Sequence, residues 1–462
     1  MPTKTFQPEL HPLLAAVFSA FEEKCIRYAL IGPYRQLRAE KPVREIDLLA
    51  RAAHLSRLCE VLCRLGFIPV PSWGHAPHHF FVSYAREEDL WIKLDVVTDL
   101  CFGKPIRALR LGFAGACLER RRRFGETYLL APEDGFIVLL TKCLIHNTGF
   151  HSFLLRGREL VALYRRVLDE PGGERRLERA VNGMLAPALS ASLIFKSVER
   201  RNWQSLMARR AALIRRMFWC EPLATLWRLL RGLTLRKGRR LLFALFRQGV
   251  WVVLLAPDGG GKSTLARHLS KDAFIRGIPI YMGGNPRSRT VGLPSPGWIE
   301  DFPGSSSRAG SYSLKRAFLK VIRAIHRWLD QQYRLTVAVY QRLRGRFVVF
   351  DRYVYDSWVA REKPSGLKRL KRRLLGFGFP RPDLVLLLDA PGQVLYRRKG
   401  EHTPGWLEAQ RQAYLGLKDR ITRMAVVDST VGADAVRRQA ISLIWNVYGN
   451  RQESRQRPSC DS

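Results

Sequence analysis

The stretch Trp251–Arg267, WVVLLAPDGGGKSTLAR, runs from apolar residues through three consecutive glycines into a helical pattern. This order predicts a buried strand, a tight loop and a helix, whose backbone N–H groups can hold phosphate groups. The residues expected to contact the phosphates are Gly259, Gly260, Gly261, Lys262, Ser263 and Thr264. In such a loop the Lys262 ammonium reaches the outer phosphates of ATP, and the Ser263 hydroxyl binds Mg²⁺.

Ala256 stands where the pattern G-x-x-x-x-G-K-[ST] has its first glycine. Glycine is used there for positive φ and for close approach to phosphate, so alanine is expected to distort the loop if the position needs either. The alternative is a glycine-rich turn that binds nothing. The strand before the loop and the helix after it favour a phosphate site.

The net charge of +38 is distributed unevenly along the 462 residues. Residues 1–103 carry 12 basic and 12 acidic side chains, whereas residues 104–249 carry 29 and 11, and the remainder carry 37 and 17. Phosphate-bearing substrates, a nucleic acid and an anionic membrane surface are all partners that such a balance would suit. A general preference for arginine in the proteome is the alternative explanation.

No apolar run is long enough to cross a bilayer, because Arg247 and Gln248 interrupt the longest ones. The first residues, MPTKTFQPEL, lack the apolar core of a secretory signal. The eight cysteines show no metal-binding spacing. We therefore expect a cytoplasmic protein with reduced cysteines.

Acidic residues recur on two predicted strands of the N-terminal region. Glu45 and Asp47 are two residues apart, which places both carboxylates on one face of their strand, and Asp95 lies in a later strand. Three carboxylates from two strands suit a site that binds paired Mg²⁺ ions for nucleotidyl transfer. A solvated strand edge is the alternative for Glu45 and Asp47.

The order strand, glycine, acidic-x-Asp strand, helix and third acidic strand resembles the DNA polymerase beta-like nucleotidyltransferase fold over residues 25–103. The Gly-Ser turn of that family is Gly32-Pro33 in this sequence, and its first aspartate is Glu45. The resemblance implies an α+β domain with metal-binding carboxylates.

The middle of the chain has helical periodicity. Within it, Arg120–Arg123 suggests either a solvated segment or an anion site. The segment Met217–Gln248 alternates large apolar residues with arginines, which fits a linker helix packed on the next domain or a helix lying on an anionic membrane.

A second apolar strand of the C-terminal region, Phe347–Phe350, ends in Asp351 and Arg352. A carboxylate at the carboxyl end of a buried parallel strand can hold Mg²⁺ directly or through water, and the neighbouring Arg352 can bridge donor and acceptor phosphates.

These landmarks, together with Pro382-Asp383 and the basic run Tyr396–Glu401, resemble the thymidylate kinase-like group of P-loop kinases over residues 250–448. The resemblance implies that Asp258 faces the sugar hydroxyl of the acceptor. It also implies that Arg397 and Arg398 belong to a lid that closes over ATP. The acceptor-binding arginine of the group would correspond to Arg287.

The predicted fold class is α/β: a parallel-sheet P-loop domain at residues 249–448, an α+β nucleotidyltransferase-like domain at 1–104 and a helical connector at 105–248. Residues 449–462 are predicted to be a disordered tail. The function predicted is phosphoryl transfer, dependent on ATP and Mg²⁺, to a phosphorylated small molecule such as a nucleoside monophosphate. A non-catalytic nucleotide sensor and a bifunctional nucleic-acid end-processing enzyme are the alternatives.

Overall fold

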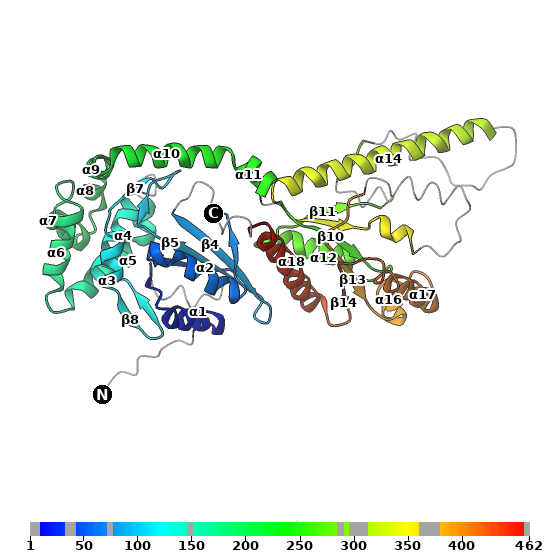
Figure 1. The fold of residues 1–462 in the computed structure, drawn as a ribbon, viewed down its shortest axis with the longest axis horizontal. Helices are drawn as coiled ribbons and strands as arrows, with labels where there is room; N and C mark the ends of the chain where they lie inside the picture. Colours follow the sequence, from blue (N-terminus) through cyan, green and yellow to red (C-terminus); the bar gives the residue numbers. More distant parts are fainter. Residues whose placement is uncertain are drawn as a thin grey trace. The chain divides into compact units, whose positions relative to one another are not determined.

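The computed structural model describes residues 10–32, 43–71, 77–145, 151–246, 248–283, 291–294, 313–359 and 379–456. The chain divides into two compact units, Met1–Arg239 and Arg240–Ser462. Each unit has its own sheet and its own core (Figure 1).

The N-terminal unit is built on a mixed sheet whose strand order is β3-β4-β5-β2-β1-β9-β8. Its strands are β1 (Tyr28–Leu30), β2 (Val43–Ala50), β3 (Ile68–Val70), β4 (His78–Ala85), β5 (Leu90–Val97), β8 (Arg122–Phe124) and β9 (Thr127–Leu129), and β6 (Cys101–Phe102) pairs separately with β7 (Leu109–Arg110). Strands β2 and β5 are parallel, with Asp47 opposite Asp95. Two distant stretches of sequence therefore place their carboxylates side by side.

Helices α1 (Pro12–Glu23) and α2 (Leu55–Arg64), with the short 3₁₀ helix η2 (Ala52–His54) before α2, share a core with this sheet that includes Phe18, Phe21 and Leu58. The remaining helices of the unit are α3 (Ala114–Glu119), α4 (Pro132–Ile145), α5 (His151–Leu168), α6 (Gly173–Met184), α7 (Ala191–Glu199), α8 (Trp203–Ala208), α9 (Arg210–Cys220) and α10 (Pro222–Lys237).

Most of these later helices are part of a second core of the unit. Phe136 and Leu140 of α4 are fully buried in one cluster with Leu49 of β2 and Val97 of β5. The apolar stripes that predict the helices thus face the sheet as well as one another. The predicted boundary at residue 104 falls inside this compact unit, and the division of the chain into three domains stays a prediction.

The four-arginine run, Arg120–Arg123, leads into the β8–β9 hairpin and pairs with acids of its own unit. Arg120 donates two hydrogen bonds to the fully buried carboxylate of Asp134, at 2.7 and 3.1 Å. Arg122 lies 2.5 Å from Glu170. These contacts give the run a structural role, because they neutralise carboxylates at the end of the sheet.

The C-terminal unit contains a five-stranded parallel sheet of order β11-β12-β10-β13-β14. Its strands are β10 (Trp251–Leu255), β11 (Ile278–Tyr281), β12 (Val348–Asp351), β13 (Leu384–Asp389) and β14 (Met424–Asp428). Its helices are α12 (Lys262–Lys271), α14 (Ser313–Leu343), α16 (Gly392–Lys399), α17 (Pro404–Leu415) and α18 (Ala433–Gln456), together with the 3₁₀ helix η4 (Val354–Ser357). Helix α11 (Arg239–Phe246) spans the boundary between the two units. The predicted α/β fold class is confirmed.

Helices cover both faces of the parallel sheet, which explains its continuous apolar strands. Trp251 and Val253 of β10 share a core cluster with Leu335 of α14 and Tyr414 of α17. Helices α12 and α18 pack on one another and contact the strands from the other side (Figure 1). The loop after β10 is thereby held at the carboxyl edge of the sheet.

The last helix, α18, continues to Gln456, into the segment predicted as a disordered tail. Arg451 explains the extension, because its guanidinium lies 2.9 Å from the Asp383 carboxylate and donates to the carbonyl of Gly249. Asp383 also accepts a hydrogen bond of 2.8 Å from the backbone N–H of Trp251. The Asp383 carboxylate therefore connects the start of β10 to α18.

Candidate functional site

The glycine-rich loop lies between β10 and α12 with two residues in the left-handed region, Gly259 (φ 85°) and Gly261 (φ 90°). A Cβ on Gly260 would lie 2.4 Å from the Ala256 methyl group. Among the described residues of the loop, positive φ occurs at glycines and not at Ala256. Alanine is therefore compatible with this backbone, and the expected distortion is not seen because the close approach falls on Gly260 instead.

Lys262 begins helix α12 and turns its side chain back onto the loop. Its Nζ donates hydrogen bonds to the carbonyl oxygens of Ala256, at 2.6 Å, and Pro257, at 3.1 Å. Burial lowers the pKa of Lys262, and the positive charge of Arg352 lowers it further. Among the described residues, the hydrogen-bond partners of this ammonium are neutral carbonyl oxygens, so a phosphate could replace them with a charged partner.

Ser263 and Asp351 meet at the carboxyl edge of the sheet. The Ser263 hydroxyl donates to Asp351 Oδ2 at 2.7 Å. The parallel pairing of β10 with β12 places Asp351 opposite Leu254, two residues before the loop begins at Ala256. A hydroxyl and a carboxylate are the hard oxygen ligands that Mg²⁺ prefers, so these two side chains fit that ion.

Arg352 follows Asp351 in a strained backbone conformation, with φ at 70°. Its Nη2 donates to Asp258 Oδ1 at 2.9 Å. A non-glycine residue in this region costs free energy and is held there by its surroundings, which is common at functional sites. In this conformation the guanidinium contacts the glycine-rich loop through Asp258.

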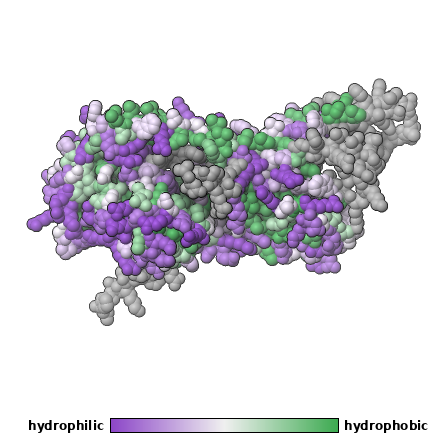
Figure 2. All heavy atoms as spheres, viewed as in Figure 1, coloured by the Kyte–Doolittle hydropathy of each residue, from purple (hydrophilic) through white to green (hydrophobic). Residues whose placement is uncertain are grey.

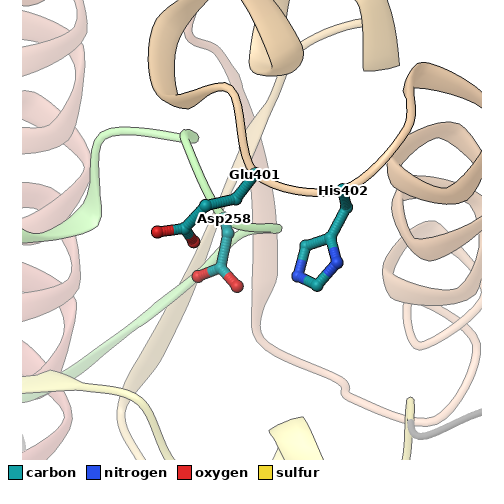
Figure 3. A group of neighbouring side chains, drawn as sticks. All are labelled: Asp258, Glu401 and His402. Carbon is teal, nitrogen blue, oxygen red and sulfur yellow. The ribbon is translucent and has the colours of Figure 1, made fainter.

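The turn after α16 places Glu401 and His402 beside Asp258 (Figure 3). One ligand atom of each of the three side chains lies within 4.8 Å of the others. Asp258 already has two cationic neighbours, Arg352 at 2.9 Å and Lys399 at 3.9 Å. Their charge disfavours a further cation at this position.

A pocket of about 610 Å³ opens over the loop and contains most of the predicted residues. Its walls include Asp258, Gly259, Gly260, Gly261, Lys262, Ser263, Thr264, Asp351, Arg352 and Arg398. Arg398 is fixed by the carbonyl of Ser429, to which Nη2 donates at 2.7 Å. Arg397 is not among the lining residues, and Arg287 lies outside the described residues.

Among the other residues that line this pocket, three have ionisable side chains that were not predicted as site residues: Lys399, Tyr281 and His268. Lys399 belongs to the same basic run as Arg398, so the run itself was a sufficient signal. Tyr281 and His268 have no local motif, because their place in the pocket depends on how β11 and α12 pack.

The N-terminal unit contains a second cluster, made of the three predicted carboxylates. Glu45, Asp47 and Asp95 each offer an oxygen within 4.8 Å of the other two. Lys93 Nζ lies 2.6 Å from Glu45, and Lys142 Nζ lies 3.4 Å from Asp47. Burial raises the pKa of Asp47, although Lys142 opposes this, and the nearby charges of Asp95 and Glu45 raise it further.

His78 is buried beside Asp95, with Nδ1 at 2.6 Å from Oδ1 of the carboxylate. The guanidinium of Arg107 approaches the same imidazole, at 3.0 Å from Nδ1. No local motif marks His78, because its partner is 17 residues away and meets it only through the pairing of β4 with β5. Each carboxylate of the cluster thus has a basic neighbour.

The parallel sheet and glycine-rich loop of the C-terminal unit define a P-loop kinase fold. No established family model matches the chain. A thymidylate kinase from Xanthomonas euvesicatoria pv. vesicatoria is 30% identical over 214 residues, which cover 44% of this chain and 86% of the relative. The chain therefore belongs to the thymidylate kinase family.

Two other relatives show the same partial coverage. The thymidylate kinase of Xanthomonas oryzae pv. oryzae is 29% identical over 44% of this chain and 86% of its own length. That of Xylella fastidiosa is 28% identical over 41% of this chain and 88% of its own. Similarity to these kinases leaves more than half of the chain unmatched, and it gives the nucleotidyltransferase resemblance no support.

Proposed function

We propose that the C-terminal unit transfers the terminal phosphoryl group of ATP to a phosphate-bearing small molecule, with nucleoside monophosphates as the first acceptors to test. The observation that carries the proposal is the Ser263–Asp351 pair, 2.7 Å apart, beside the buried Lys262 on a glycine-rich loop. Kinship with thymidylate kinases supports the same reaction class.

The side chains of the pocket would divide the work of phosphoryl transfer. Mg²⁺, bound through Ser263 and Asp351, would neutralise charge on the phosphates. Lys262 would leave the loop carbonyls to contact a phosphate oxygen. Arg352 and Arg398 would stabilise the negative charge that spreads over the transferring group, because guanidinium groups bind such oxygens at two points.

Asp258 would contact the acceptor, opposite the ATP phosphates. In the structure its carboxylate accepts from Arg352 at 2.9 Å. An acceptor hydroxyl at Asp258 and an acceptor phosphate at Arg352 would use the two groups together. The separation of Asp258 and Arg352 would therefore determine how far apart the sugar hydroxyl and the phosphate of the acceptor can lie.

The test is ADP formation from ATP and Mg²⁺ with a panel of nucleoside monophosphates and sugar phosphates. We expect turnover with at least one nucleoside monophosphate, and a loss of about a hundredfold or more in Asp351→Asn. Asp419→Asn, which changes an exposed aspartate, is the control. ATP binding without turnover of any acceptor would instead indicate a nucleotide sensor.

A second candidate function rests on the convergence of Glu45, Asp47 and Asp95. We propose metal-dependent nucleotidyl transfer to a nucleic-acid end as the activity of the N-terminal unit. Incorporation of a labelled nucleoside triphosphate into short RNA or DNA should disappear in Asp95→Asn. Binding to the same oligonucleotides should weaken steeply with salt, and a flat salt response would refute a nucleic-acid substrate.

A further inference from the structure

Helix α10 presents a continuous stripe of large apolar side chains to solvent. Its members, together with the preceding Trp219, are Leu223, Leu226, Trp227, Leu230 and Leu233. Within α10, Leu226 and Trp227 each lie three or four residues from Leu223 and Leu230, and Leu233 follows three residues later, which places the five on one face of the helix. Leu223 is 82% exposed and Trp227 is 65% exposed.

The opposite face of α10 is fixed against its own unit. Thr225 and Gly232 are buried, and a Cβ on Gly232 would lie 2.5 Å from a side-chain carbon of Ile106. Arg236 donates to the carbonyl of Pro105 at 3.1 Å. Because these contacts hold the helix closely on this side, the apolar stripe is held facing outward.

Basic residues surround the stripe. From Arg209 to Arg240 the sequence has ten basic residues and one acidic residue, Glu221. That carboxylate is paired with Arg228. Arg231 and Lys237 are exposed on the same helix. The segment that carries the stripe is therefore strongly positive, and its single acid is paired with one of its own arginines.

A groove of about 500 Å³ continues the apolar surface at Trp219 and is also lined by Arg215 and Pro187. Figure 2 shows hydrophobic residues along the upper edge, at the position of α10. Helix α10 has 16 residues, and no helix in the described part of the chain is long and apolar enough to cross a membrane. A short amphipathic helix of this kind can lie flat in the interface of a membrane, with its apolar face toward the acyl chains.

We propose that α10 inserts its apolar stripe into the surface of an anionic phospholipid bilayer. Leucines would lie among the upper acyl carbons, tryptophan rings at the headgroup level, and Arg231 and Lys237 against lipid phosphates. The proposal does not depend on either proposed catalytic activity. Charge complementarity between the basic surroundings and an anionic surface selects a membrane over a second copy of this positively charged chain.

The test is sedimentation of the full chain with vesicles of phosphatidylcholine alone or of equal parts phosphatidylcholine and phosphatidylglycerol. We expect binding to the anionic vesicles only, weakened by salt. The double variant Leu226→Gln, Leu230→Gln should bind about tenfold more weakly or worse. The matched control is Leu154→Gln, Leu155→Gln, which changes two leucines of α5 that are 65% and 68% exposed.

Equal binding by the two double variants would overturn the proposal, as would equal affinity for neutral vesicles. A changed oligomeric state or a marked loss of thermal stability in Leu226→Gln, Leu230→Gln would also overturn it, because the stripe would then be packed against protein. Arg231→Glu provides an independent measurement. It should weaken binding to anionic vesicles while leaving the oligomeric state and the thermal stability unchanged.

Discussion

Replacing Lys262 with methionine tests whether the buried ammonium is held in place for a phosphate. The substitution keeps most of the side-chain volume and removes the charge. A hydrogen bond to a charged partner contributes roughly 1.5–3 kcal/mol, so ATP–Mg²⁺ should bind about 10- to 150-fold more weakly. Turnover should fall by at least the same factor.

Stability should change little in the same variant, for two opposing reasons. The hydrogen bonds from Lys262 to Ala256 and Pro257 are lost. The cost of burying the ammonium, which lowers its pKa, is relieved at the same time. We expect the net change in unfolding free energy to stay within about 1 kcal/mol, or about 4 °C in Tm.

Isothermal titration with ATP and Mg²⁺ measures the affinity, and calorimetric melting measures the stability. Lys271→Met is the matched control, because Lys271 is exposed at the end of the same helix. It should leave both quantities unchanged. Affinity of the Lys262 variant within about twofold of the parent would refute the assignment of the phosphate cradle.

Two further substitutions test the packing of the same unit. Gly260→Ala should lower stability by about 1–3 kcal/mol and abolish tight ATP binding, because the new Cβ would lie 2.4 Å from Ala256. The control is Gly405→Ala, where a Cβ meets open space, and it should do neither. Thermal melting and ATP titration measure stability and affinity in both variants. Hydrogen bonds, first of all from Gln412, lower the pKa of Glu408 from 4.5 to about 2, so this carboxylate stabilises the fold above its usual pKa and loses that effect as pH falls toward 2. Since the side chain is 40% exposed, Glu408→Gln should cost only about 1 kcal/mol at neutral pH, and urea denaturation should show this difference vanishing below about pH 2.

The glycine-rich loop could be predicted from the sequence because its parts are contiguous. Glycines, Lys262 and Ser263 occupy neighbouring positions, and the apolar run before them has the length of a buried strand. The structure confirms the strand and the helix at Trp251–Leu255 and Lys262–Lys271. The strand, the loop and the helix each depend on residue types that are close together in the sequence, so a local pattern is enough to predict them.

The significance of Ala256 could not be read in the same way. The motif alone suggests a distorted loop, whereas the structure places the close contact at Gly260 and lets Ala256 adopt an ordinary backbone. Which position needs glycine depends on the three-dimensional course of the loop. A pattern of letters does not contain that information.

The helical middle shows the same limit on a larger scale. Its periodicity predicts helices, and helices are present. The periodicity does not predict which residues their apolar faces contact. Phe136 and Leu140 join the core of the N-terminal sheet, in a cluster with residues more than thirty positions away in the sequence. Periodicity identifies the buried face of a helix and leaves its partner undetermined.

The sequence by itself determined strand β10, helix α12 and the residues of the glycine-rich loop between them, because these follow from local pattern. Only the tertiary structure decided that Ser263 meets Asp351, 88 residues later, and that Asp95 meets His78. The physical reason is strand register. Pairing of β10 with β12, and of β4 with β5, brings together side chains whose proximity no stretch of sequence specifies.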